Sequence, residues 1–202
     1  MQVKSERRSN RDRTEATRGD LIAAARKLFT EKSYAETGTP EIVAAAGVTR
    51  GALYHHFTDK QALFEAVAEQ EANAVAEEVE RAAPTALGAR EALLVGTEAY
   101  LRAMQAPGRT RLLLLDGPAV LGRPGMDAID DRHGNRTLRE GLAATMRAGA
   151  MRKLPLAALT SLLAATFDRA ALAIDAGAPF ADQVAVISAL IDGLMVEPNG
   201  NA

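Results

Sequence analysis

The 202-residue sequence lacks cysteine and tryptophan and has few aromatic residues, and these absences narrow the choice of fold and chemistry. Without cysteine there is no disulfide framework, no thiolate nucleophile and no thiolate metal site. Aromatic residues make up 4% of the chain, whereas alanine and leucine are abundant, which favours helices over sheets. We therefore expect an all-α protein whose length suits one or two domains.

Several kinds of segment and motif are also missing. The sequence contains no uninterrupted apolar run of about 18 residues, so we predict no membrane span. The charged N-terminal residues do not resemble a signal peptide. The sequence has no nucleophile-elbow glycine pattern, no phosphate-cradling P-loop and no glycine-rich dinucleotide motif. We therefore predict a soluble cytoplasmic protein that is not an enzyme and needs no cofactor.

Charge is distributed unevenly along the chain. Residues 1–60 carry 11 Lys and Arg against 8 Asp and Glu, while residues 61–202 carry 13 against 18. The formal net charge is −2, but the first part is positive and suits contact with phosphate.

The most informative stretch is TPEIVAAAGVTRGALYHHFTDK, residues 39–60, which predicts two short helices joined by a tight turn. Thr39 can cap the first helix, with Pro40 at its first helical position. Gly47 follows that helix where a left-handed residue commonly ends one, and Thr49 can cap a second helix from about residue 50 to 57. This pattern indicates a helix-turn-helix, although two short core helices would share much of it.

The second helix has two distinct faces. Leu53 and Phe57 are four residues apart and share its buried face. Arg50, Tyr54 and His55 lie elsewhere on the helix, towards solvent or a partner. A buried face opposite a polar face suits a recognition helix that enters the major groove of DNA.

These residues carry a specific resemblance. The motif Thr39-x-x-Ile42, Ala46-Gly47-Val48-Thr49, Gly51-x-Leu53-Tyr54-x-His56-Phe57-x-x-Lys60-x-x-Leu63 resembles the tetracycline-repressor-like (TetR) family of transcriptional regulators, over about residues 18–65. The resemblance implies an all-α fold of about nine helices. It implies an N-terminal three-helix helix-turn-helix domain that binds DNA, and a C-terminal helical domain that binds a ligand and dimerises.

We place the DNA-binding domain at residues 14–60 and the C-terminal domain at residues 61–202. Residues 1–13 are polar and basic, and we expect them to be a disordered arm. The arm either contacts DNA or is only a solubilising tail; its basic residues are Lys4, Arg7, Arg8, Arg11 and Arg13.

Arg50 and Tyr54 are the first candidates for contact with bases, because Arg can donate two hydrogen bonds to guanine and the Tyr ring can touch a thymine methyl. Gly51 and Ala52 allow close approach, and Tyr54 could instead be partly core. By the family resemblance, phosphate contacts are implied at Arg18, Thr39, His55, His56 and Lys60. Pro40 stands where the family often has a polar residue. The predicted DNA-binding set is Arg18, Thr39, Thr49, Arg50, Gly51, Ala52, Tyr54, His55, His56 and Lys60.

Beyond the motif, apolar periodicity and Pro and Gly residues predict further helices. We expect helices at residues 60–81, 87–106, 109–116, 124–149, 154–176 and 179–195, with an interruption at Gly117-Pro118. The last two are apolar on more than one face, so each is central in the monomer or packs on a second copy. The resemblance implies a four-helix dimer interface, with candidates Leu159, Leu163, Ile187, Leu190, Ile191 and Leu194.

A ligand pocket in the C-terminal region is implied by the resemblance alone. Bulky and flexible apolar side chains are its candidate lining, although each could be ordinary core: Tyr100, Met104, Leu113, Leu114, Met126, Met146 and Phe167. The cluster Asp127, Asp130, Asp131 and His133 could suggest a metal, but no second group recurs at ligand spacing, so no metal site is predicted.

The leading hypothesis is a homodimeric, ligand-responsive regulator, most often a repressor, that binds a palindromic operator on double-stranded DNA and is released by a small apolar or amphipathic effector. One alternative is a helical small-molecule carrier or enzyme that has kept the fold without DNA function. Another is a DNA-organising protein with no effector.

Overall fold

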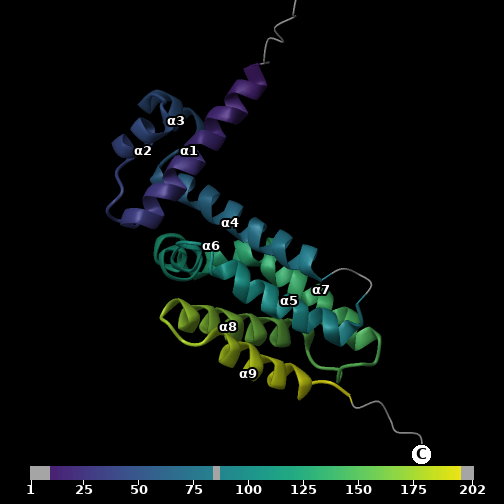
Figure 1. The fold of residues 1–202 in the computed structure, drawn as a ribbon. Coiled ribbons are helices and arrows are strands. Elements are labelled where there is room, and N and C mark those ends of the chain that lie inside the picture. Colours follow the sequence, from purple (N-terminus) through teal and green to yellow (C-terminus); the bar gives the residue numbers. More distant parts are fainter. Residues whose placement is uncertain (1–9, 84–86, 197–202) are drawn as a thin grey trace, which may run out of the picture. The chain divides into compact units, whose positions relative to one another are not determined.

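The computed structural model describes residues 10–83 and 87–196, and their regular structure is helical apart from one bridge pair between Met151 and Met195. The elements of this described part are α1 Asn10–Lys32, α2 Thr39–Ala46, α3 Arg50–His56, α4 Lys60–Ala82, α5 Ala89–Met104, η1 Arg111–Asp116, α6 Gly117–Arg132, α7 Gly134–Arg147, α8 Leu156–Asp175 and α9 Phe180–Asp192 (Figure 1). The predicted all-α fold is confirmed. The chain divides into two compact units, Met1–Ala68 and Glu69–Ala202, and the division falls inside α4, beyond the predicted boundary at residue 60.

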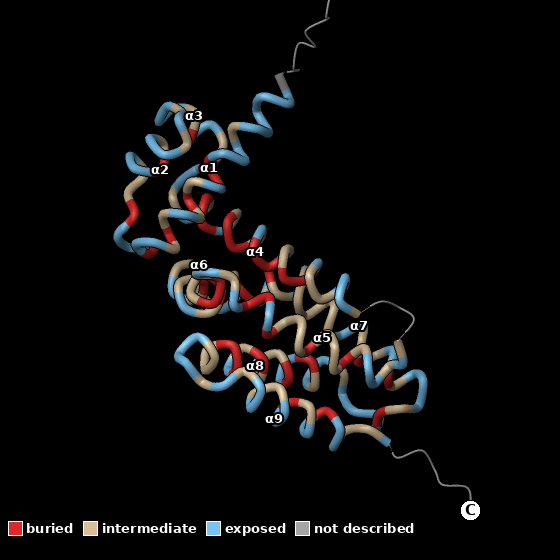
Figure 2. Tube along the Cα trace, viewed as in Figure 1, coloured by how far each residue is buried: buried red, intermediate tan, exposed pale blue. Residues whose placement is uncertain are grey.

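The first unit is built around an aromatic core. The Phe29 ring centroid lies 5.4 Å from that of Phe64 and 5.5 Å from that of Tyr34. Helical spacing brings one apolar face of each helix to this core, which Figure 2 marks red, and its fully buried members are Leu21, Ala25, Phe29, Ile42, Leu53, Leu63 and Phe64. Burial of each large side chain stabilises the unit by about 1.5–3 kcal/mol.

The turn between α2 and α3 has the predicted form. Gly47 adopts φ 66° and ψ 28°, and its N–H donates to the carbonyl of Ala44. The Thr49 hydroxyl accepts from the N–H of Ala52 at 3.1 Å and so caps α3. The predicted cap of α2 is wrong: Gly38 is the N-cap, while Thr39 is the first helical residue and makes no capping bond. Its hydroxyl is thereby available to α3.

The first helix extends into the expected arm of residues 1–13. α1 starts at Asn10, and its first turns contain an exposed i,i+4 ion pair with 3.0 Å between Arg11 Nε and Glu15 Oε1. Part of the expected disordered arm is therefore helix. Lys4, Arg7 and Arg8 lie outside the described residues.

In the second unit, α5 packs against α7, α8 and α9, and α8 packs against α9. Figure 1 shows α8 and α9 side by side. The core between them consists of one apolar face of each helix: Leu93, Leu101, Met104, Leu142, Leu163, Phe167, Ala170, Ile187 and Ile191.

The middle of this unit departs from the predicted helices. The expected break at Gly117-Pro118 is absent, since the π-helical η1 runs directly into α6 and Pro118 occupies the first turn, where its missing N–H is not needed. A Cβ at Gly117 would lie 2.7 Å from Met126 Sδ and 3.0 Å from the carbonyl oxygen of Leu112, so this junction favours glycine. The chain bends instead at Gly122, with φ 72°.

The single helix expected at residues 124–149 is also wrong. It is interrupted at His133, whose φ of −123° and ψ of −98° are not helical, so the chain forms α6 and α7. The ring Nε2 of His133 lies 2.6 Å from the carboxylate of Glu69, a tertiary contact that periodicity does not reveal.

Candidate DNA-binding surface and ligand cavity

The polar face of α3 is exposed as predicted. Leu53 is fully buried beneath the helix and Phe57 is 5% exposed, whereas Tyr54 is 43% exposed. Arg50 lies one turn before Tyr54, and its guanidinium carbon is 5.5 Å from the centre of the Tyr54 ring. The pair thus presents a guanidinium and an aromatic ring together to solvent.

Thr39 of α2 joins this pair. Hydrogen bonds from Thr39 first, and then from Arg50, lower the pKa of Tyr54. Thr39, Arg50 and Tyr54 therefore form one polar group across the helix-turn-helix, which we call the α3 cluster. Because Thr39 is not used as a cap, its hydroxyl can serve this group.

A second group connects α1 to the end of α3. The Arg18 guanidinium carbon lies 5.3 Å from the centre of the Phe57 ring. Burial, followed by the charges of His55 and Arg18, lowers the pKa of His56. The structure thus brings together three predicted phosphate contacts, Arg18, His55 and His56, although their contact with DNA stays a prediction.

Lys60 is engaged within the first unit. Its Nζ donates to the backbone carbonyls of Tyr34 at 2.9 Å and Thr37 at 3.0 Å. It also lies 4.0 Å from the centre of the Tyr34 ring. Lys60 therefore fastens the loop between α1 and α2, a structural role that the sequence did not reveal; its phosphate contact stays a prediction.

The second unit contains a cavity of about 1160 Å³ with walls from α4, α5, α6, α7 and α8. Two of the seven predicted lining residues, Tyr100 and Phe167, form part of its wall. Met104, Leu113 and Met126 are buried elsewhere in the core, and Leu114 and Met146 are half-buried away from the cavity. Bulky side chains fill the core, whereas the open volume of the cavity is bordered by residues with small side chains. These residues are Ala92, Gly96, Gly141, Ala144, Ala157, Ala164 and Ala165.

The cavity has one strongly polar region that sequence reasoning missed. The Tyr100 hydroxyl donates to Asp168 Oδ1 at 2.6 Å. Burial and the nearby charge of Asp168 raise the pKa of Asp130 to about 7, and burial also raises the pKa of Asp168. We call Tyr100, Asp130 and Asp168 the acidic cluster. Asp127, Asp130 and Asp131 all border the cavity; Asp127 pairs with Arg123 and Asp131 accepts from Asn135, whereas no described side chain hydrogen-bonds to Asp130.

No metal-binding group of three or more His, Asp or Glu side chains occurs in the described part of the chain. His133 contacts Glu69 rather than the nearby aspartates. Asp127 pairs with Arg123, with 2.9 Å between Oδ1 and Nε.

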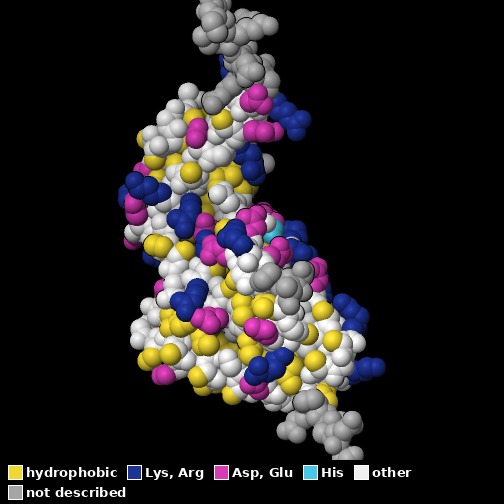
Figure 3. Space-filling model, turned by 45° about the vertical axis from the view of Figure 1, so that its right-hand side comes forward, with side chains coloured by type: hydrophobic (Ala, Val, Ile, Leu, Met, Phe, Trp, Pro, Cys, Tyr) yellow, Lys and Arg dark blue, Asp and Glu magenta, His cyan; other side chains and the backbone are white. Residues whose placement is uncertain are grey.

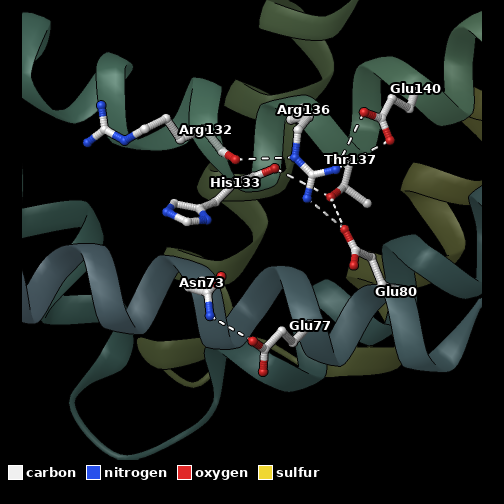
Figure 4. Close-up of polar contacts among 8 residues, drawn as sticks. All are labelled: Asn73, Glu77, Glu80, Arg132, His133, Arg136, Thr137 and Glu140. Carbon is white, nitrogen blue, oxygen red and sulfur yellow. Dashed lines mark hydrogen bonds and ion pairs between the residues drawn. The ribbon is translucent and has the colours of Figure 1, made fainter.

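Carboxylates along α4 attach this helix to its neighbours on two sides. On one side, Glu69 binds Arg132 at 2.6 Å, and Glu80 binds Arg136 at 2.8 Å and accepts from Thr137 at 3.1 Å. Figure 4 shows Arg136 also reaching Glu140 and the carbonyl of Arg132. The part of α4 that belongs to the second unit is thus linked by ion pairs to α6 and α7.

The other side of α4 contacts a buried arginine. Arg109 is 6% exposed and precedes η1. Its Nε lies 2.9 Å from Glu71 Oε2, and its Nη1 lies 3.0 Å from Glu78 Oε1 and donates to the carbonyl of Ala103 at 2.6 Å. Displacement of the η1 segment would therefore act directly on α4.

Three of the six predicted dimer residues require a correction. Leu163, Ile187 and Ile191 are buried in the core of the unit, because the protomer itself covers their face. Leu159 and Leu194 are half-buried, and Leu190 is exposed. The exposed large apolar residues of these two helices are Leu162 at 69%, Val186 at 61% and Leu190 at 50%.

Hydrophobic side chains gather on the surface of the second unit in Figure 3, where they are yellow. α8 is also long and apolar enough, by length and composition alone, to cross a membrane, with a mean hydropathy of 1.4 and 28% of that window buried. An apolar helix that is only partly covered offers an apolar surface to a further partner.

Comparison with known proteins bears on both units. Residues 21–67 match the family described as "Bacterial regulatory proteins, tetR family", and residues 90–194 match "Tetracyclin repressor-like, C-terminal domain". The chain is 34% identical over 94 residues to the transcriptional activator FasR of Mycolicibacterium smegmatis, covering 46% of this chain and 43% of that relative. The chain therefore aligns with less than half the length of that curated relative.

Solved structures match over a greater length. A TetR-family transcriptional regulator from Pectobacterium atrosepticum is 33% identical, with a TM-score of 0.74, covering 95% of this chain and 100% of that one. RolR in complex with resorcinol has the same fold at 19% identity, with a TM-score of 0.72 and coverage of 93% and 92%.

Proposed function

The chain belongs to the TetR family of bacterial regulatory proteins, which are DNA-binding transcriptional regulators, and from this premise we propose that it binds a palindromic operator as a homodimer. We propose further that it is a repressor that a small apolar or amphipathic molecule releases from DNA. The relatives are regulators rather than enzymes, and this chain is not an enzyme. The observation that carries the proposal is the exposed α3 cluster on the second helix of the helix-turn-helix.

In this proposal α3 enters the major groove. Arg50 donates two hydrogen bonds to a guanine, and the Tyr54 ring contacts a neighbouring base. Arg18, Thr49, His55 and the other predicted contacts hold phosphates on either side. Because Gly51 is exposed and has no side chain, the backbone of α3 can approach the bases closely.

A single helix-turn-helix contacts too few bases for useful affinity, so two copies are needed. The exposed apolar residues Leu162, Val186 and Leu190 of α8 and α9 support a symmetric interface with the same helices of a second copy. Such an interface would also cover the apolar surface of α8. A regulator of this kind acts on the chromosome, and we propose a cytoplasmic location.

The cavity supports an effector site, as does the similarity of the C-terminal region to a repressor-like domain. RolR, which shares the fold, binds resorcinol. The cavity touches α4, and ion pairs join α4 to α6, α7 and Arg109, so a ligand that displaces these elements would displace α4. The ligand releases DNA only if it binds the non-binding arrangement more tightly.

The test combines selection of DNA with two matched variants. Genomic fragments retained by the protein should share a palindromic sequence, and affinity for it should fall steeply as salt rises. Arg50→Ala should weaken binding by about 1–3 kcal/mol and relax one base position. Arg147→Ala, which removes the same charge from an exposed site at the end of α7, should leave binding unchanged.

Two outcomes would contradict the proposal. If no fragment is retained above background, the chain is a small-molecule carrier that has kept the fold. If Arg50→Ala binds the selected fragment as tightly as the parent, α3 is not the reading helix.

A further inference from the structure

We propose that the ligand cavity of the second unit takes an apolar molecule that carries a protonated amine, with the amine bound between Asp130 and Asp168. The inference rests on the proposed function, in which this cavity is the effector site, and names the chemical class of the effector. It is carried by the side chains that converge at one region of the cavity wall.

Three helices supply the acidic cluster. Tyr100 comes from α5, Asp130 from α6 and Asp168 from α8, and all three line the cavity. The Tyr100 hydroxyl uses its only proton in the 2.6 Å bond to Asp168 Oδ1. Within the described residues, no side chain donates a hydrogen bond to the Asp130 carboxylate. When Asp130 is ionised, the cluster therefore offers only acceptors to the cavity.

The other charged groups on the wall do not neutralise the cluster. The wall contains the carboxylates Glu80, Asp127, Asp130, Asp131, Glu140 and Asp168, but only two guanidinium groups, Arg123 and Arg139. The charge of Arg123 lowers the pKa of both Asp130 and Asp168, but burial outweighs it, and the Arg123 side chain is 69% exposed and binds Asp127 at 2.9 Å. Glu80 and Glu140 bind Arg136. The inner pair, Asp130 and Asp168, is left with excess negative charge.

The surrounding wall suits an aromatic or aliphatic cation. The Tyr100 and Phe167 ring centroids lie 6.0 Å apart, and both rings border the cavity beside Asp168. Aromatic faces attract cations within about 6 Å. Small residues such as Gly96 and Ala164 leave apolar space for the body of the molecule. An anionic ligand would instead meet two carboxylates in a poorly solvated site.

Without a bound cation, protonation of Asp130 reduces the negative charge of the acidic cluster. Burial and Asp168 raise the pKa of Asp130 to about 7, with smaller contributions from Asp127 and Asp131 that raise it and from Arg123 that lowers it. A bound ammonium group would replace that proton, because it stabilises the charged form of Asp130. Binding should therefore release a proton near neutral pH and tighten as pH rises through about 7.

The test uses two probes of the same shape and different charge, 1-naphthylmethylamine and 1-naphthalenemethanol, titrated calorimetrically into the full chain. The amine should bind at least about tenfold more tightly at pH 8, the lower end for a charge-assisted hydrogen bond in a protein interior. Asp130→Asn and Asp168→Asn should each remove most of this preference. Asp131→Asn, an equal charge change at an exposed position of the wall, should retain it.

Proton release provides the second readout. Titration at pH 7 in buffers of different ionisation enthalpy should show release with the amine and none with the alcohol, and Asp130→Asn should abolish the release. If the alcohol binds as tightly as the amine, or if the preference survives in both variants, the inference is wrong while the cavity remains a ligand site. If neither probe binds at millimolar concentration, the inference is also wrong, and fragment retention separately decides whether the chain is a DNA-binding regulator.

Discussion

Replacing Lys60 by methionine would remove the fastening of the loop between α1 and α2. Methionine keeps the apolar length of the side chain and loses only the ammonium group. The change abolishes the two hydrogen bonds to the carbonyls of Tyr34 and Thr37 and the contact with the Tyr34 ring. It separates the structural role of Lys60 from its predicted contact with phosphate.

The expected loss follows from these contacts. A buried hydrogen bond to a charged group contributes about 1.5–3 kcal/mol, and a cation over an aromatic ring about 0.5–1 kcal/mol at an exposed site. Lys60 is half-buried, so water replaces part of what is lost. We expect the free energy of unfolding to fall by about 2 kcal/mol.

Equilibrium urea denaturation of the full chain measures this loss, and Lys32→Met is the matched control. Lys32 lies in the same unit and also has a 2.9 Å contact, but its partner is Glu41 and both side chains are about half exposed. Surface pairs of this kind contribute about 0–1 kcal/mol. If Lys60→Met destabilises the chain no more than Lys32→Met, the contacts of Lys60 with the loop between α1 and α2 do not stabilise the first unit.

The same variant also tests the contact with phosphate. Loss of one phosphate contact reduces the slope of log affinity against log salt by about 1 for every DNA sequence. A weaker complex with an unchanged slope would mean that Lys60 acts only through the loop.

Three further predictions concern the second unit. Gly117→Ala should lower the free energy of unfolding by about 1–3 kcal/mol, because its new methyl would lie 2.7 Å from Met126 Sδ and 3.0 Å from the carbonyl oxygen of Leu112, whereas Gly134→Ala, with open space around it, should not destabilise; urea denaturation measures both. Leu190→Glu should shift the proposed dimer towards monomer in sedimentation, whereas Leu115→Glu, at a similarly exposed apolar site on η1, should not. The folded state holds the Asp130 proton more tightly than the unfolded chain, so this stabilisation is present below about pH 4 and is lost as pH rises through about 7. Asp130→Asn should remove that part of the pH dependence, of the order of 2–4 kcal/mol, in denaturation series from pH 4 to 8.

The helix-turn-helix was predictable because its determinants lie within a few residues of each other. The cap at Thr49 and the left-handed Gly47 depend on neighbouring backbone groups, and the spacing from Leu53 to Phe57 defines the buried face. The exposed position of Tyr54 follows from the same periodicity. Lys60 was different, because its two acceptors lie 26 and 23 residues earlier in the chain.

The cavity was less predictable, because it depends on missing volume. Large residues were the natural candidates for its wall, yet Met104 and Met126 fill the core and Gly96 and Ala164 border the open space. The acidic cluster joins α5, α6 and α8, so no local pattern could unite Asp130 with Asp168. Leu163, Ile187 and Ile191 were misplaced for a related reason: periodicity identifies the apolar face of a helix, but not which partner covers it.

The double attachment of α4 has a consequence for how a signal would travel. Glu69 and Glu80 form ion pairs with arginines on one side of the helix, and Glu71 and Glu78 form ion pairs with Arg109 on the other. A shift of the helix along its axis would therefore break ion pairs on both sides. We therefore expect the helix to switch between two positions rather than to slide gradually. A weak effector would then change the fraction of molecules in the second position, and not the distance that α4 moves in each molecule.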